Sequence, residues 1–250
     1  MLKDYFKALY ERTMREAYSR AHVEINESLM NGGMCLDCGA GHGHKFRQLN
    51  SQIGLDTARY HGIEWDERKV EIARNDGINV VTGDLNKGIE HPDDTFRCIF
   101  GLSVLEHLLF PCRYLRECYR CLEGGGQLVL LTPNISTYFT AALILAGRMP
   151  SSGPHPDSEA LLQKEELLKV SHDALVYDGE SDIPLHRHLV VFSYRVLKTY
   201  LGMIGFESIR GYGYGLYPFP NFTQPLLERL DPYHCHQMVF VATKPGALKV

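Results

Sequence analysis

Residues 34–43 read Met-Cys-Leu-Asp-Cys-Gly-Ala-Gly-His-Gly, and this stretch decides the fold class. It opens with a short apolar run, interrupted by the acid Asp37, and ends in a turn with glycine at every second position, 39, 41 and 43. Residues 44–49 then begin a helix by their pattern. A strand that passes through a glycine turn into a helix lets the backbone approach a bound nucleotide closely, so the stretch predicts an α/β fold.

Strands and helices alternate downstream of this turn. The expected strands are residues 60–63, 79–82, 98–102 and 127–131, and the expected helices are residues 67–75 and 112–122, the second of them stopped by the glycines at 124–126. This alternation predicts a parallel sheet with helices on both faces. A helix over 194–204, a strand from Phe206, a Tyr/Gly/Pro-rich loop up to Asn221 and a last strand over 237–243 complete the expected core.

Two stretches fall outside this alternation. Residues 1–30 have apolar residues at helical spacing and predict one or two N-terminal helices. Residues 135–190 contain a proline- and glycine-rich piece and an expected helix over 158–170. A long connection inside a compact domain is usually functional, so we interpret this segment as a lid insertion that shapes the acceptor pocket. The chain is expected to form a single domain, residues 1–250.

The composition excludes several classes of protein. A formal net charge of −4 disfavours nucleic acid as the substrate, because proteins that bind phosphate backbones usually carry a basic excess. The apolar run 141–146 is far too short to span a membrane, and the charged N-terminal stretch lacks the apolar core of a signal peptide. Seven cysteines, an odd number scattered through expected strands and helices, predict reduced thiols and a cytoplasmic location.

Acids around the glycine turn favour S-adenosyl-L-methionine (SAM) over a dinucleotide. The spacing is G-x-G-x-G rather than G-x-G-x-x-G, and Asp37 suits the ammonium of SAM better than a pyrophosphate. Glu64, at the end of the second strand, can accept hydrogen bonds from both ribose hydroxyls. Asp84, after the third strand, can accept one from the adenine amino group, with Leu85 beside the ring. Any one of these acids alone has an equally good structural interpretation.

These motifs together resemble class I SAM-dependent methyltransferases, most closely the small-molecule group that includes quinone-biosynthesis O-methyltransferases. The resemblance rests on residues 36–43 (LDCGAGHG), 62–64 (GIE), 83–85 (GDL), 103–107 (SVLEH) and 122–126 (LEGGG). It implies a Rossmann-like, mostly parallel sheet of seven strands whose last strand is antiparallel. SAM then lies across the carboxyl ends of the strands, and S-adenosyl-L-homocysteine is the product. Two features depart from the family pattern: His42 and His44 flank the last glycine, and residues 135–189 match no known motif.

The expected cofactor-binding residues are Asp37, Gly39, Ala40, Gly41, Glu64, Trp65, Asp84, Leu85 and Ser103. His107, after the fourth strand, is the first candidate for a general base, which is needed only if the acceptor is protonated at neutral pH. It has an alternative role in ordering its loop. His186 and His188 are further catalytic candidates, since they precede the returning helix and could line the pocket from the lid. Tyr212, Tyr214 and Tyr217 either form an aromatic wall of that pocket or pack their own loop.

No metal site is expected. Cys35-x-x-Cys38 and Cys118-x-x-Cys121 have the spacing of zinc ligands, and residues 234–236 (HCH) add further donors. The first pair, however, lies in an expected strand and the second in an expected helix. His186 and His188 could join an acid in a metal-dependent O-methyltransferase, yet the sequence displays no matching acid cluster.

The leading hypothesis is an enzyme that transfers a methyl group from SAM to a small-molecule acceptor, with oxygen slightly favoured by the resemblance. A SAM-binding regulatory or partner protein without transferase activity is the alternative. An open pocket beside the sulfonium would support the enzyme, and a pocket plugged by the insertion would support the binding protein. An NAD-linked oxidoreductase is a third hypothesis, disfavoured by the glycine spacing.

Overall fold

A seven-stranded sheet forms the centre of the molecule, in the order β3-β2-β1-β4-β5-β7-β6. The computed structural model describes residues 2–164 and 186–246. The strands are β1 (Cys35–Cys38), β2 (Tyr60–Glu64), β3 (Val80–Thr82), β4 (Phe96–Leu102), β5 (Leu122–Pro133), β6 (Glu207–Tyr214) and β7 (Gln237–Thr243). Neighbouring strands from β3 to β5 are parallel, whereas β7 runs antiparallel to both β5 and β6. The expected sheet, with its last strand antiparallel, is confirmed.

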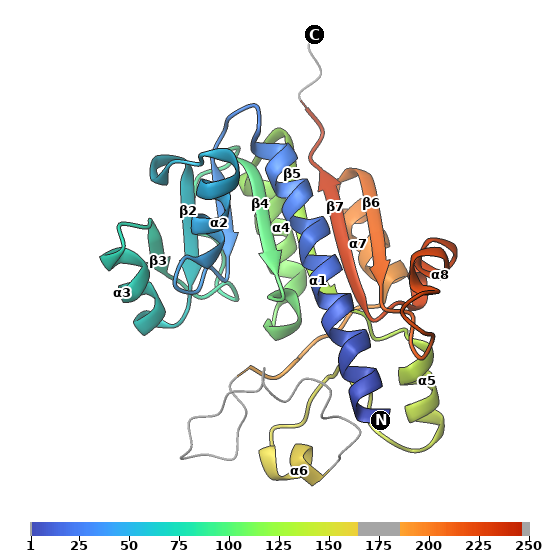
Figure 1. Ribbon diagram of the computed structural model, residues 1–250. Coiled ribbons are helices and arrows are strands. Elements are labelled where there is room, and N and C mark those ends of the chain that lie inside the picture. The colour runs from blue at the N-terminus through green and yellow to red at the C-terminus, as the bar shows by residue number, and fades with distance from the viewer. Residues whose placement is uncertain (1, 165–185, 247–250) are drawn as a thin grey trace.

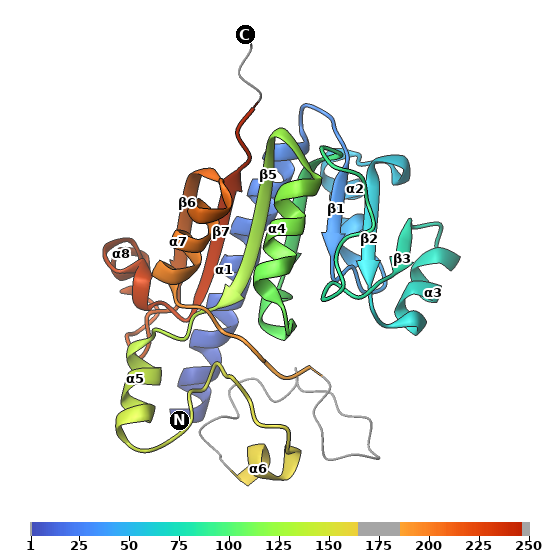
Figure 2. The same ribbon diagram turned by 180° about the vertical axis from the view of Figure 1, so that it is seen from behind.

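Helices cover both faces of the sheet (Figures 1 and 2). One face carries α1 (Leu2–Leu29), α2 (His44–Ile53) and α3 (Glu67–Asn75), and the other carries α4 (Pro111–Cys121) and α7 (Tyr194–Ile204). Strand side chains alternate between the two cores: in β5, Leu128 and Leu130 pack toward α4 and α7, while Val129 and Leu131 pack toward α1. This alternation follows from the two-residue period of a strand, and it fixes which residues reach each layer.

Of the remaining elements, the one at residues 57–59 directly precedes β2, and the others lie around the carboxyl ends of the parallel strands or beside β6. These remaining elements are η1 (Thr57–Arg59), η2 (Leu105–His107), α5 (Tyr138–Leu145), α6 (Glu159–Lys164), α8 (Gln224–Leu230) and η4 (Pro232–His234). In both views α5, α6 and the N-terminal end of α1 lie beyond the carboxyl ends of the strands (Figures 1 and 2). The described residues of the segment interpreted as a lid therefore lie at the edge where the cofactor is expected.

Two expectations about the elements need correction, and a third extends beyond the described residues. The glycines at 124–126 do not lie between a helix and a strand, because β5 begins at Leu122, which pairs with Phe96. A Cβ at Gly126 would lie 2.9 Å from the carbonyl oxygens of Glu123 and Phe96, so glycine here permits close strand pairing. Tyr212 and Tyr214 belong to strand β6 rather than to a loop. The helix expected over 158–170 is described only as α6, and its remainder lies outside the described residues.

Helix α1 is one continuous helix of 28 residues. No helix in the described part of the chain has the length and apolar character needed to cross a bilayer.

Candidate active site

The carboxyl ends of β1, β2, β3 and β4 bring most of the predicted site residues to one edge of the sheet. In open α/β sheets, ligands bind at this edge because helix amino ends and strand-terminal loops meet there. Two groups of side chains share the edge. The first, called the cofactor side below, comprises Asp37, the glycine turn 39–43, Glu64 and Asp84; the second, the acceptor side, comprises Glu106, His107, His186 and His188.

The glycine turn on the cofactor side requires glycine at Gly39. This residue has φ +80°, and a Cβ there would lie 2.6 Å from Cγ2 of Val104. At Gly41, with φ +55°, a Cβ would meet no atom within 4 Å, so the backbone there borders open space. The Gly41 amide donates to Oε2 of Glu64 at 2.8 Å. An exposed backbone turn beside a fixed carboxylate is suited to holding a nucleoside-containing cofactor.

Glu64 is buried and accepts three backbone hydrogen bonds. Besides the bond from Gly41, its Oε1 accepts from the amides of Trp65 and Asp66, both at 3.0 Å. A carboxylate has about four acceptor positions, so one remains for a hydroxyl donor, and a second hydroxyl can bind only if one of the backbone bonds is shared or replaced. Glu64 thus stabilises the glycine turn in addition to the ribose contact predicted for it.

Asp37 is a buried carboxylate with one hydroxyl partner. The Tyr60 hydroxyl donates to its Oδ2 at 2.6 Å, and the side chain is otherwise enclosed by the sheet. Burial raises the pKa of Asp37 to about 7, although the Tyr60 hydrogen bond and the nearby Lys45 ammonium oppose this shift. A cation bound beside it would stabilise the charged form, so the ammonium of SAM fits this position.

The other predicted cofactor residues differ in their exposure. Asp84 is exposed and accepts hydrogen bonds from the backbone and side chain of Asn86, while Leu85 beside it is buried. Trp65 is exposed. Ser103 has φ +57°, an unusual conformation for a residue other than glycine, and its hydroxyl lies 3.2 Å from the Tyr18 hydroxyl of α1. Ala40 is buried within the turn.

Glu106, His107 and His188 form a compact cluster on the acceptor side. One potential ligand atom of each residue lies within 4.8 Å of those of the other two. Glu106 is buried and accepts a hydrogen bond from the Thr132 hydroxyl at 3.0 Å. No acid was expected from the sequence to join these histidines, because Glu106 is adjacent to His107 but 82 positions from His188 along the chain. Only the fold brings them together.

Backbone carbonyls of the insertion hold both histidine rings. Nδ1 of His107 donates to the carbonyl oxygen of Arg187 at 3.1 Å, and Nδ1 of His188 donates to that of Ser152 at 2.7 Å. A carbonyl oxygen can only accept, so the neutral rings carry their proton on Nδ1 and a lone pair on Nε2. Burial lowers the pKa of both histidines and raises that of Glu106, with the His188–Glu106 attraction opposing the shift at each partner.

His186 links the two sides. Its ring centroid lies 5.9 Å from that of Trp65 and 6.1 Å from that of His107. Burial lowers the pKa of His186, while the Glu64 carboxylate opposes this shift. The His186 ring therefore lies between Trp65, which follows β2, and His107, which follows β4.

Two tyrosines predicted as an aromatic wall have other contacts. The Tyr212 hydroxyl donates to Glu24 of α1 at 3.1 Å, and the Tyr217 hydroxyl donates to Thr13 at 3.1 Å. Tyr212 and Tyr214 pack against the core between the sheet and α1. These contacts hold the tyrosines against α1 and the sheet.

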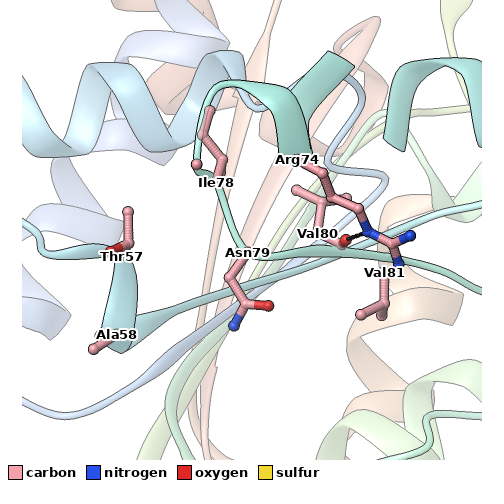
Figure 3. A pocket seen from close by; sticks show the side chains of 8 residues that line it. Thr57, Ala58, Arg74, Ile78, Asn79, Val80 and Val81 are labelled. Carbon is pink, nitrogen blue, oxygen red and sulfur yellow. Dashed lines mark hydrogen bonds between the residues drawn. The ribbon is translucent and has the colours of Figure 1, made fainter. Parts of the chain in front are cut away.

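The cysteine pairs are not arranged as a metal site in the described part of the chain. Cys35, Cys38, Cys118 and Cys121 are all buried free thiols within the core, and none belongs to a group of three ligand-bearing side chains at metal-binding distance. A surface hollow of about 580 Å³ is lined by residues that include Thr57, Arg74 and Asn79. Figure 3 shows how these side chains lie. These residues lie near the amino ends of β2 and β3, opposite the predicted site.

Comparisons with known proteins show what the chain is similar to. A family model described as a methyltransferase domain matches residues 10–210. Over 125 residues, 48% of the chain, it is 30% identical to a protein of Mycolicibacterium smegmatis named a probable S-adenosylmethionine-dependent methyltransferase, of which the match covers 46%. The chain thus spans less than half the length of this relative.

Two further similar proteins are matched over a larger share of their own length. The chain is 27% identical over 189 residues to a ubiquinone biosynthesis O-methyltransferase of Pseudomonas putida, which covers 68% of this chain and 79% of that protein. Among solved structures, a SAM-dependent methyltransferase from Thermotoga maritima matches 96% of this chain and 99% of its own, with a TM-score of 0.54 and 20% identity. The structural likeness concerns the fold.

Proposed function

The chain belongs to the methyltransferase domain family and is a class I enzyme that uses SAM, and on this premise we propose that it methylates an oxygen atom of a small-molecule acceptor. Membership of this family favours the enzyme over the regulatory SAM-binding protein and over the NAD-linked oxidoreductase. The proposal concerns the acceptor, its methylated atom and the residues that act on it.

The observation that carries the proposal is a proton acceptor at the end of β4. His107 donates through Nδ1 to the Arg187 carbonyl, which leaves the Nε2 lone pair available. When bound, SAM supplies a methyl group on a positively charged sulfur, which is already a strong electrophile. A nearby base is most useful for an acceptor that is protonated at neutral pH, such as a hydroxyl group, because its proton must leave as the oxygen attacks.

We assign the cofactor-side residues to binding and orientation. Asp37 would pair with the ammonium, Glu64 with the ribose hydroxyls and Asp84 with the adenine amino group, while the Gly39–Gly41 backbone lies against the cofactor. The insertion would exclude water from the acceptor, since its Leu189 and Val190 amides donate to the Glu106 carbonyl oxygen beside the candidate base, at 2.6 Å and 3.3 Å. Orientation and desolvation contribute much of the rate in such displacements.

The oxygen assignment also has support from a relative. The Pseudomonas putida protein that the chain resembles over 79% of its length is named an O-methyltransferase. An amine acceptor with a free lone pair would have less use for the half-buried His107, whose pKa burial lowers.

The first test is calorimetric titration with S-adenosylhomocysteine, with NAD as a parallel control. We expect micromolar binding of the first and none of the second. The protein is then incubated with methyl-labelled SAM and three acceptor panels: hydroxylated aromatics, amines and RNA. Label in the hydroxylated panel alone supports the proposal, and label in amines or RNA alone overturns the acceptor assignment.

A further inference from the structure

We propose that Glu106, His107 and His188 bind a divalent transition-metal ion, and that the acceptor oxygen completes its coordination. This inference rests on the proposed methyl transfer to oxygen and names the class of acceptor: a molecule with a hydroxyl that can coordinate a metal. No metal site was expected from the sequence, because the acid that completes it, Glu106, lies far from His188 along the chain.

The first observation is the donor set. Two imidazoles and one carboxylate, each with a potential ligand atom within 4.8 Å of the others, come together at the carboxyl ends of β4 and β5. Metal–ligand bonds of about 2.0–2.2 Å place neighbouring donors roughly 3–3.5 Å apart, so a movement of the order of 1 Å closes this cluster on an ion. Among the described residues this is the one group of three ligand-bearing side chains at such distances.

The second observation is how the ligands are held. A histidine that binds a metal donates its other ring N–H to a carbonyl or carboxylate, which fixes its orientation and tautomer. His107 and His188 both do so, to the carbonyls of Arg187 and Ser152. Glu106 is oriented by the Thr132 hydroxyl. A further histidine, His155, also contacts His188: the backbone amide of His188 donates to Nδ1 of His155 at 3.1 Å.

The donor types restrict the ion. Two nitrogens and one oxygen suit Zn²⁺, Co²⁺, Mn²⁺ or Fe²⁺, whereas Mg²⁺ and Ca²⁺ prefer oxygen ligands throughout. Three protein ligands leave at least one coordination position for another molecule, as in catalytic rather than structural sites. Glu106 and His107 lie within four positions of Ser103, which is predicted to contact the cofactor, so the open position would lie near the methyl group.

The chemical consequence concerns the acceptor proton. In the metal-bound protein the Nε2 lone pair of His107 would bind the ion instead of the acceptor proton, and the ion would replace the base: a hydroxyl that coordinates a divalent ion becomes more acidic, so its proton can leave to water near neutral pH. The oxygen then forms a bond to the methyl carbon, the carbon–sulfur bond breaks, and its electron pair remains on sulfur as a neutral thioether. No oxidant or reductant takes part, so any of the four ions can serve.

The test is titration of the metal-free full chain with Zn²⁺ by calorimetry and with Co²⁺ by visible absorption. We expect one ion per chain and a ligand-field spectrum for Co²⁺. The variants His107→Asn, His188→Asn and Glu106→Gln should each weaken binding at least tenfold. Asparagine retains a side-chain amide that can donate to the same carbonyl, and glutamine can still accept from Thr132, so these changes remove a ligand with little effect on packing.

His234→Asn is the matched control. His234 also pairs with a carboxylate, Asp231, at 2.8 Å, but lies outside the cluster, and it belongs to the 234–236 stretch first considered as a source of zinc ligands. Its loss should leave Zn²⁺ affinity within about twofold of wild type. Absence of Zn²⁺ and Co²⁺ binding, or binding that all three cluster variants retain, would overturn the inference.

S-adenosylhomocysteine titration, with and without a chelator, separates this inference from the proposed function. Cofactor binding with label transfer that a chelator does not reduce overturns the metal site and leaves the function standing. Metal binding lost in the cluster variants, without cofactor binding or label transfer, overturns the function and leaves the metal site standing.

Discussion

The cofactor side and the acceptor side share one edge of the sheet. The contacts that hold the two sides in place differ in how far apart the bonded residues are in the sequence. On the cofactor side, the bonds Tyr60–Asp37 and Gly41–Glu64 each join residues 23 positions apart, within one strand–helix–strand unit. On the acceptor side, the bond from His107 to Arg187 spans 80 positions. The cofactor side can therefore form as the sheet forms, whereas the acceptor side also requires the insertion to dock.

This difference predicts that the two sides can be damaged separately. Substitutions on the acceptor side should lower kcat and leave cofactor affinity unchanged. Substitutions on the cofactor side should weaken cofactor affinity and leave kcat at saturating SAM nearly unchanged. The following predictions test this separation, beginning with the largest expected effect.

Replacing His107 should have the largest effect on catalysis. We expect His107→Asn to lower kcat by roughly 10²–10⁴-fold, the usual contribution of a positioned proton acceptor, while the Kd for S-adenosylhomocysteine changes less than about twofold. Steady-state kinetics with an acceptor from the hydroxylated panel and calorimetry on the same preparation measure both quantities. An unchanged kcat removes His107 from the catalytic step, and a large change in Kd contradicts the separation of the two sides.

Removing a cofactor-side acid should weaken cofactor binding. Asp37→Ala and Glu64→Ala should each cost about 1–3 kcal/mol of SAM affinity, the typical loss of a charge-assisted hydrogen bond. At saturating SAM, kcat should fall far less than in His107→Asn. Glu67→Ala is the control, because this acid lies three positions after Glu64 and is exposed. Wild-type affinity in both acid variants would rule out the assigned cofactor contacts.

Asp37 should also make the stability of the cofactor-free protein depend on pH. Its folded pKa is about 7, above the ordinary value of 3.8, so the folded state retains this proton after the unfolded chain has lost it. Wild type should therefore lose stability relative to Asp37→Asn as pH rises from about 4 to 7, by at most about 4 kcal/mol.

Urea denaturation of both proteins at pH 5 and pH 8 measures this difference. We expect the unfolding free energy of Asp37→Asn, relative to that of wild type, to be larger at pH 8 than at pH 5. Parallel curves for the two proteins would mean that Asp37 is not protonated in the folded state at pH 5.

The smallest effect is expected at Tyr18, which lies between the two sides. Its hydroxyl is 3.2 Å from that of Ser103, and the negative charges of Glu106 and Asp37 both act on it, each raising its pKa, although burial is the larger cause. Tyr18→Phe should lower the free energy of unfolding by about 0.5–1.5 kcal/mol, the net value of one hydrogen bond. Kd and kcat should each change less than about threefold. A tenfold change in either would show that α1 takes part in the site.

The same difference in sequence separation explains which parts of the site could be predicted from the sequence. The cofactor side follows from motifs confined to strand ends, so the positions of Asp37, Glu64 and Asp84 at one edge follow from the sequence alone. The boundaries of α3, α7 and β7 also agree with the expected ranges, because their apolar periodicity ends at clear stop signals.

The acceptor side could not be predicted in the same way. Glu106 lies in a run with no periodic pattern, and its partners Thr132 and His188 come from separate segments. Likewise, Tyr212 could not be placed in β6 from a Tyr/Gly-rich stretch, since glycine usually indicates a loop and only pairing with Val239 of β7 makes it a strand. Both failures concern contacts between segments that are far apart in the sequence.

The antiparallel course of β7 has a practical consequence for handling the protein. Because β7 runs against the parallel strands, it ends at the edge opposite the predicted active site, whereas α1 begins on the side of that site (Figure 1). A fluorescent fusion, affinity tag or surface linker attached after β7 would therefore leave the acceptor entrance free, and one attached ahead of α1 would crowd it. Immobilisation through the carboxyl-terminal end is the orientation to choose for a binding sensor.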